Sequence, residues 1–113
     1  IFFTANSQEF IDSKSFSSKT VKGIVVIEFW VDWNKGNEVE FIGGLKDCKA
    51  YRICISKNPD IKNEYNITSV PTVVILDNGL EKYRFNSDIM MRLAATKKEV
   101  QSSINNIILE KFK

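Results

Sequence analysis

The run Ile24–Trp30 constrains the fold of this chain more than any other feature. It reads Ile-Val-Val-Ile-Glu-Phe-Trp, so every residue except Glu28 is apolar. A run this apolar and this rich in β-branched residues is typical of a strand buried on both faces, as at the centre of a parallel sheet. Residues 72–76, Thr-Val-Val-Ile-Leu, have the same character. The sequence therefore predicts an α/β domain built around two buried strands.

The segments around these strands carry weaker signals. Residues 1–4 are apolar and β-prone, and Asn6 or Ser7 can cap a helix that continues through Ile11 and Phe16. A strand is expected at residues 50–55 and a brief helix at 59–65. Residues 38–45 can form a short helix, weakened by two consecutive glycines. Its apolar face would consist of Val39, Ile42 and Leu45.

The C-terminal third predicts a hairpin and a long helix. Residues 77–79, Asp-Asn-Gly, favour a tight turn because Asn and Gly tolerate positive φ, and residues 81–85 would return as an edge strand. Thr96 and Glu99 match a capping box that starts the helix. The helix positions expected to lie on the sheet recur at helical spacing: Val100, Ile104, Ile107 and Ile108.

Composition excludes several classes of function. At 113 residues the chain is expected to form one domain over 1–113, and its net charge of +2 offers no electrostatic case for nucleic acid. No run approaches the roughly 18 apolar residues of a membrane span, so no membrane association is expected and a cytoplasmic location is favoured. With no histidine and two cysteines, serine triads and four-ligand metal sites are disfavoured. We expect neither a metal nor a cofactor.

Several motifs, taken in order, resemble thioredoxin. Phe-Trp-Val-Asp-Trp at residues 29–33 is followed by a four-residue turn, and Val70-Pro71-Thr72 opens the second buried strand. The resemblance covers nearly the whole chain and implies a thioredoxin fold, a mixed sheet of four to five strands flanked by helices. It also implies a cis peptide bond between Val70 and Pro71, facing the turn.

The turn itself departs from the family. Thioredoxins carry Trp-Cys-Gly-Pro-Cys, whereas this chain reads Trp33-Asn34-Lys35-Gly36-Asn37. Disulfide exchange requires a thiolate that attacks a sulfur, and an amide side chain cannot serve. The turn therefore predicts that the chain is not a disulfide reductase. Asn34 is expected instead to cap the following helix.

The resemblance also assigns supporting and binding residues. Glu28 matches a buried family acid and Arg52 a nearby family lysine, which implies a structural ion pair. In the family, the second tryptophan and the loop before the proline line a peptide groove. The candidate binding residues are Trp33, Asn34, Lys35, Gly36, Asn37, Val70, Pro71 and Thr72. Trp33 is expected on an exposed rim and Trp30 partly buried.

Three functions stay open at this point. The favoured one is a non-catalytic thioredoxin-like module that binds an unknown protein or peptide, or serves as an assembly subunit. The alternative is a divergent thiol–disulfide redox protein that uses Cys48 or Cys54, or that has an additional domain supplying thiols. Extended chain between Cys48 and Cys54 would hold their Cα atoms beyond the roughly 7 Å that a disulfide spans. A third is a purely architectural piece with an apolar interface around residues 89–93.

Overall fold

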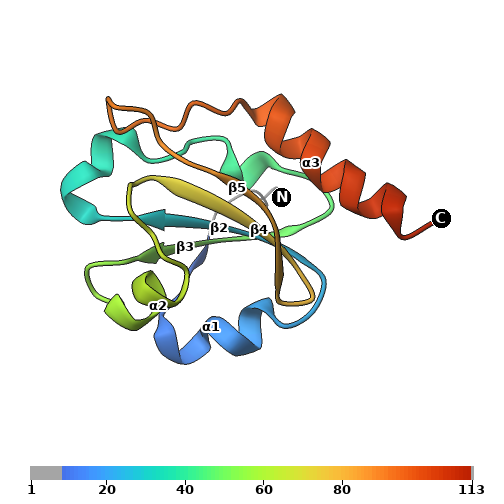
Figure 1. The fold of residues 1–113 in the computed structure, drawn as a ribbon, viewed down its shortest axis with the longest axis horizontal. Helices are drawn as coiled ribbons and strands as arrows, with labels where there is room; N and C mark the ends of the chain where they lie inside the picture. Colours follow the sequence, from blue (N-terminus) through green and yellow to red (C-terminus); the bar gives the residue numbers. More distant parts are fainter. Residues whose placement is uncertain (1–8, 113) are drawn as a thin grey trace, which may run out of the picture.

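The computed structural model describes residues 9–112, and within this range five strands form one mixed sheet (Figure 1). In sheet order the strands are β1 (Glu9–Phe10), β3 (Lys49–Cys54), β2 (Ile24–Trp30), β4 (Thr72–Asp77) and β5 (Leu80–Phe85). β2 pairs in parallel with β3 and antiparallel with β4, and the tight hairpin expected from sequence joins β4 to β5. The mixed sheet of the sequence prediction is therefore confirmed.

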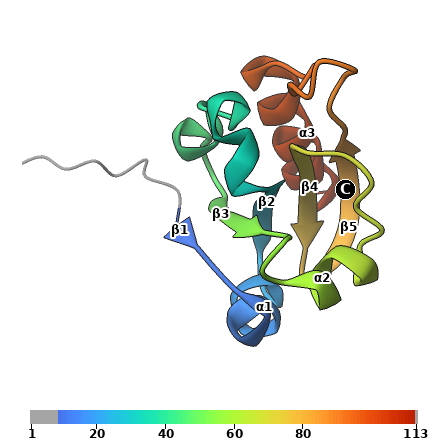
Figure 2. The ribbon, with the colours of Figure 1, turned by 90° about the vertical axis from the view of Figure 1, so that its left-hand side faces the viewer.

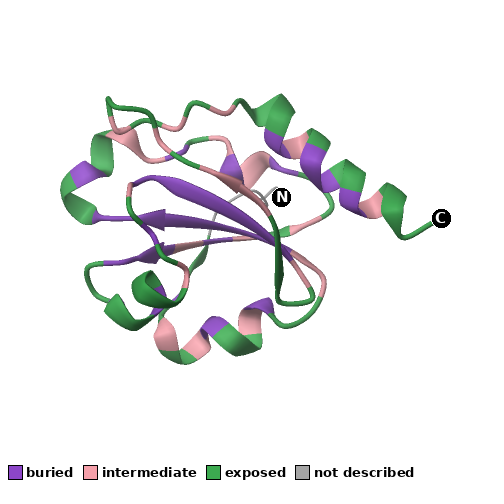
Figure 3. Cartoon of the chain, in the orientation of Figure 1, coloured by how far each residue is buried: buried purple, intermediate pink, exposed green. Residues whose placement is uncertain are grey.

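Helices cover both faces of this sheet. α1 (Ser13–Thr20) and α2 (Pro59–Glu64) lie on one face, and α3 (Lys97–Glu110) lies on the other (Figures 1 and 2). β2 and β4 are almost wholly buried between these layers, whereas β5 is an exposed edge (Figure 3). This is the arrangement that the two apolar runs predict.

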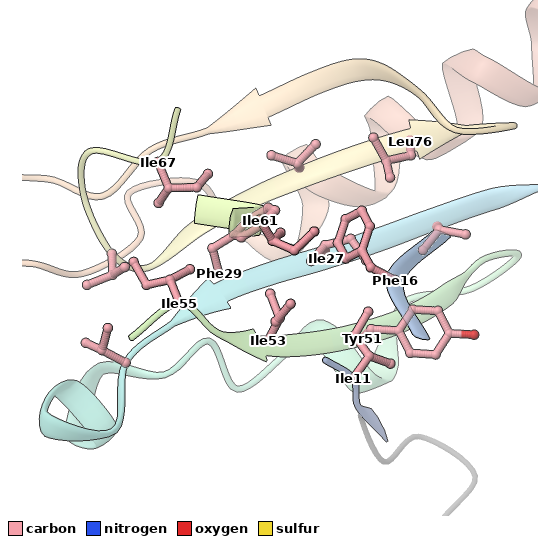
Figure 4. Close-up of a cluster of buried hydrophobic side chains, with 14 residues drawn as sticks. Ile11, Phe16, Ile27, Phe29, Tyr51, Ile53, Ile55, Ile61, Ile67 and Leu76 are labelled. Atoms are coloured by element: carbon pink, nitrogen blue, oxygen red, sulfur yellow. The ribbon is translucent and has the colours of Figure 1, made fainter. Parts of the chain in front are cut away.

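Each face of the sheet carries its own core. Under α1 and α2, aromatic and β-branched side chains from several elements meet, among them Phe16, Phe29 and Ile61 (Figure 4). Under α3, the cluster includes Val26, Ile75 and Ile104, all fully buried. α3 begins as predicted, with the Thr96 side chain accepting from the Glu99 amide and the Glu99 side chain accepting from the Thr96 amide.

The first helix was placed wrongly from sequence. It begins at Ser13, where Asp12 accepts from the Ser15 amide at 3.0 Å and the Ser15 hydroxyl accepts from the Asp12 amide. Phe10, expected inside the helix, belongs to β1, and its ring packs edge-on against Trp30 at 5.7 Å. Pairing with β3 thus outweighs local helix propensity. The strand expected at 1–4 and the Asn6 or Ser7 cap lie outside the described residues.

The helix predicted at residues 38–45 is also wrong. Only a 3-10 turn, η2 (Ile42–Gly44), forms there, although Val39, Ile42 and Leu45 are buried as expected. The Val39 amide donates to the Glu28 carboxylate at 2.9 Å, and the Val39 carbonyl accepts from Arg52 at 3.4 Å. Because both backbone groups of Val39 bind a buried ion pair, they are not available to a helical ladder.

Candidate functional site

The candidate site lies where β2 ends, at the 3-10 segment η1 (Asp32–Asn37). Val31, which precedes it, makes no side-chain cap, and Asn34 lies at a kink inside it, with non-helical φ and ψ of −106° and 28°. The Asn34 side-chain oxygen accepts from the side-chain amide of Asn37 rather than from a backbone amide of the next turn. The prediction that Asn34 caps a helix is therefore wrong. Its burial explains why: at 8% exposure its amide points inward, to partners distant in the sequence.

Asn34 joins the turn to a distant loop. Its side-chain nitrogen donates to the Met91 carbonyl at 3.2 Å and lies 3.5 Å from the Val70 carbonyl. Its side-chain oxygen accepts from the side-chain amide nitrogen of Asn37 at 3.0 Å. The two asparagines thus form one hydrogen-bonded unit that ties η1 to the segment between β5 and α3.

That segment is an ordered loop. The Asp88 carboxylate accepts from the backbone amides of Met90 and Arg92, and the Asp88 amide donates to the Arg92 carbonyl at 2.8 Å. Ile89, at its tip, is 97% exposed, while Met91 packs against the core below α1 and α2. The loop therefore carries apolar side chains both toward the core and toward solvent.

On the other side of the turn, the loop before β4 approaches Asn34. The Val70–Pro71 peptide bond is cis, and the Thr72 hydroxyl donates to the Ser69 carbonyl at 2.7 Å. Val70, Pro71 and Thr72 are all buried. Of the three, only Val70 lines the groove described next.

A groove of about 400 Å³ opens beside Trp33. It is lined by Val31, Trp33, Ile55, Ser56, Lys62, Thr68, Ser69, Val70 and Met91. Trp33 forms an exposed wall, 68% accessible, as the sequence predicts, whereas Trp30 at 8% belongs to the core rather than being partly buried.

Other predicted binding residues lie elsewhere. Gly36 and Asn37 line a smaller hollow with Arg92 and Leu93, and the exposed Lys35 lines neither. Sequence reasoning missed Ile55, Lys62 and Met91, because each comes from a different segment and no local motif marks it. Only the fold brings them to Trp33.

Beneath η1, Glu28 and Arg52 form an ion pair with an N–O distance of 3.0 Å. The Glu28 side chain is fully buried and that of Arg52 is 11% exposed. The guanidinium also reaches Glu38 at 3.3 Å and lies over the rings of Phe10 and Trp30 at 5.6 and 5.7 Å. The Glu28 carboxylate is therefore bound by the permanently charged guanidinium of Arg52 and by the Val39 amide, as expected for a structural ion pair.

Cys48 and Cys54 are both free thiols. Cys54 ends β3 and is buried, with its sulfur 3.2 Å from the Ser56 hydroxyl. Cys48 is half-buried, and burial, with a smaller effect of the adjacent Asp47 carboxylate, raises the pKa of its thiol to about 11. Neither thiol has the exposed, electropositive surroundings that activate a cysteine.

Comparison with known proteins identifies the family to which the chain belongs. The chain is 34% identical to thioredoxin of Mycoplasma genitalium over 71 residues, which cover 58% of this chain and 70% of the relative. Over 81 residues it is 30% identical to thioredoxin of Rickettsia bellii, covering 64% and 77%. The chain belongs to the thioredoxin family. The turn after β2 reads Trp33-Asn34-Lys35-Gly36-Asn37 and contains no cysteine.

Solved structures agree on the fold. A point mutant of thioredoxin from Halobacterium salinarum superposes with a TM-score of 0.72 at 15% identity and covers 94% of this chain and 95% of that one. Malassezia sympodialis thioredoxin gives 0.69 at 21% identity, with the same coverage. No protein-family model matches the chain. Within residues 9–112, none of the helices is long and apolar enough to cross a membrane.

Proposed function

We propose that this thioredoxin-family protein is a non-catalytic module that binds a protein or peptide through the groove beside Trp33. One observation carries the proposal. Where a thioredoxin would present its attacking sulfur, Asn34 is buried and its amide is committed to the Met91 carbonyl and to Asn37. The position serves as a hydrogen-bonded strut rather than as a reactive group.

The surroundings of Asn34 support the loss of chemistry. In the family the buried acid exchanges a proton with the inner cysteine, but Glu28 here accepts from Arg52 and from the Val39 amide. A permanently charged guanidinium holds this carboxylate in place. The redox alternative would depend on Cys54, which is buried, or on Cys48, where burial disfavours the thiolate that exchange requires.

Peptide binding, in contrast to disulfide exchange, requires an exposed complementary surface but no reactive group. Trp33 is an amphipathic ring exposed next to an apolar groove, and tryptophan is among the residues that most often anchor protein interfaces. The groove volume lies within the roughly 300–1,000 Å³ of ordinary ligand sites. A surface of this kind functions without any thiol.

An insulin-reduction assay tests the redox half of the proposal. With dithiothreitol as reductant, the wild-type chain should precipitate insulin at the rate of reductant alone, beside an active thioredoxin as positive control. Activity above background that disappears in Cys48→Ser or Cys54→Ser would establish the redox alternative and contradict the proposal.

Selection from a phage-displayed library of random peptides tests the binding half. Peptides recovered on the wild-type chain should lose binding to Trp33→Ser. Leu80→Ser is the matched control, because Leu80 is an equally exposed apolar side chain, 65% accessible, in the edge strand β5. Recovery of no peptide, or of peptides that bind Trp33→Ser as well as wild type, would refute a binding site at the groove.

A further inference from the structure

The groove beside Trp33 combines an apolar lining with one charged side chain. Val31, Ile55 and Val70 form its buried base, and Met91 and Trp33 close its sides. Of the described residues that line it, Lys62 is the only charged one. A bulky apolar side chain therefore fits this groove best, and a charged group beside it would lie close to the ammonium group of Lys62.

Lys62 is not neutralised by its surroundings. It is exposed on α2, and within residues 9–112 it forms no ion pair. The two acidic residues on the same helix, Asp60 and Glu64, do not pair with it, and the Asp60 carboxylate accepts from the Ser13 hydroxyl. The ammonium group of Lys62 is therefore available to a carboxylate of an occupant.

Neutral polar groups complete the lining. Ser56, Thr68 and Ser69 add hydroxyl groups beside the apolar base. Hydroxyl groups both donate and accept, so they can pair with the amides and carbonyls of an extended chain without selecting its sequence. Sequence preference is left to the apolar base and to Lys62.

Building on the proposed function, we infer that the occupant is an acidic–apolar peptide segment, in which a bulky apolar residue is flanked by Asp or Glu. The apolar side chain enters the groove against Ile55 and Met91, and an adjacent carboxylate lies at the ammonium of Lys62. Charge at an exposed rim contributes modestly to affinity and more to the salt dependence of binding, so each acidic residue should strengthen binding about threefold.

Three short synthetic peptides, labelled with fluorescein, test this preference by anisotropy. The first carries Leu-Phe at its centre between two aspartates, the second has lysines in place of the aspartates, and the third keeps the aspartates but replaces Leu-Phe with Ser-Ser. The first should bind about tenfold more tightly than the second at about 0.05 M salt, and the difference should shrink at about 0.3 M salt because the charges are screened. The third should not bind.

Lys62→Glu should reverse the order of the first two peptides. Lys22→Glu is the matched control, since Lys22 is equally exposed but precedes β2, at the end of the strand opposite the groove. Equal affinity of the acidic and basic peptides, or an unchanged order in Lys62→Glu, would overturn the inference.

The peptide library separates this inference from the proposed function. Peptides that depend on Trp33 but show no excess of Asp or Glu would leave the proposed function standing and overturn the acidic preference. An empty selection would refute both.

Discussion

Arg52 balances a carboxylate that is buried from solvent, and replacing it tests whether the site is built on that ion pair. Arg52→Met retains a long aliphatic side chain against the rings of Phe10 and Trp30 but removes the guanidinium. The fully buried Glu28 then loses its cation. Breaking one partner of a buried pair costs about 3–5 kcal/mol because it leaves an uncompensated charge.

This loss is large against the total stability of a small domain, which is about 5–15 kcal/mol. With a urea m-value of about 1.5 kcal/mol per molar, the unfolding midpoint should fall by about 2–3 M. Far-UV circular dichroism at pH 7 is the appropriate readout, since the fluorescence of Trp30 would itself respond to the missing guanidinium.

A double-mutant cycle separates charge from packing. Glu28→Gln still accepts from the Val39 amide, so Glu28→Gln with Arg52→Met should be more stable than Arg52→Met alone. Glu38→Gln is the matched control: its side chain is 32% exposed, and loss of that pair should cost less than about 1 kcal/mol. A loss below about 1 kcal/mol in Arg52→Met, or an equal loss with Gln at position 28, would refute the ion-pair argument.

Three further outcomes follow from the site and its supports. Asn34→Ala should destabilise the fold by about 1–2 kcal/mol and speed hydrogen exchange in residues 86–94, because the hydrogen bond to Met91 is lost. Asn37→Ala removes only the bond to Asn34 and should cause a smaller loss of stability and a smaller change in exchange. Iodoacetamide should alkylate Cys48 of the folded chain slowly at pH 8 and faster toward pH 11, because burial raises the pKa of its thiol to about 11. Mass spectrometry measures the extent of labelling. Equally fast labelling of the folded and the urea-unfolded chain at pH 8 would contradict this. Thr96→Ala should cost about 1 kcal/mol in urea unfolding by removing the cap of α3, whereas the exposed Ser102→Ala should be near neutral.

Local signals in the sequence account for the elements that the site rests on. The two apolar runs became β2 and β4, and the Asp-Asn-Gly turn and the Thr96 capping box marked the hairpin and the start of α3. Each signal is short-range, a matter of side-chain period, backbone freedom or a cap within one turn. Predictions from such signals hold because the strand pairing and packing of these segments agree with their local preferences.

Two of the predictions that failed concern segments whose hydrogen-bonding groups have distant partners. Residues 38–45 have helical periodicity, but Glu28 and Arg52 occupy both backbone groups of Val39. Asn34 is a good helix cap by residue type, yet in the fold its amide reaches Met91. In both cases a buried polar group took a partner from another element, because an unpaired polar group in the interior is costly.

By itself, the sequence determined the mixed α/β architecture, the family resemblance and the absence of cysteine from residues 33–37, since these depend on local pattern and residue identity. Tertiary structure alone decided how Asn34 is held and which side chains surround Trp33. The strut from Asn34 to Met91, and the placement of Lys62, Ile55 and Met91 around Trp33, join residues from separate elements. Their proximity arises from the packing of loops and helices around one end of the sheet, which no local sequence pattern encodes.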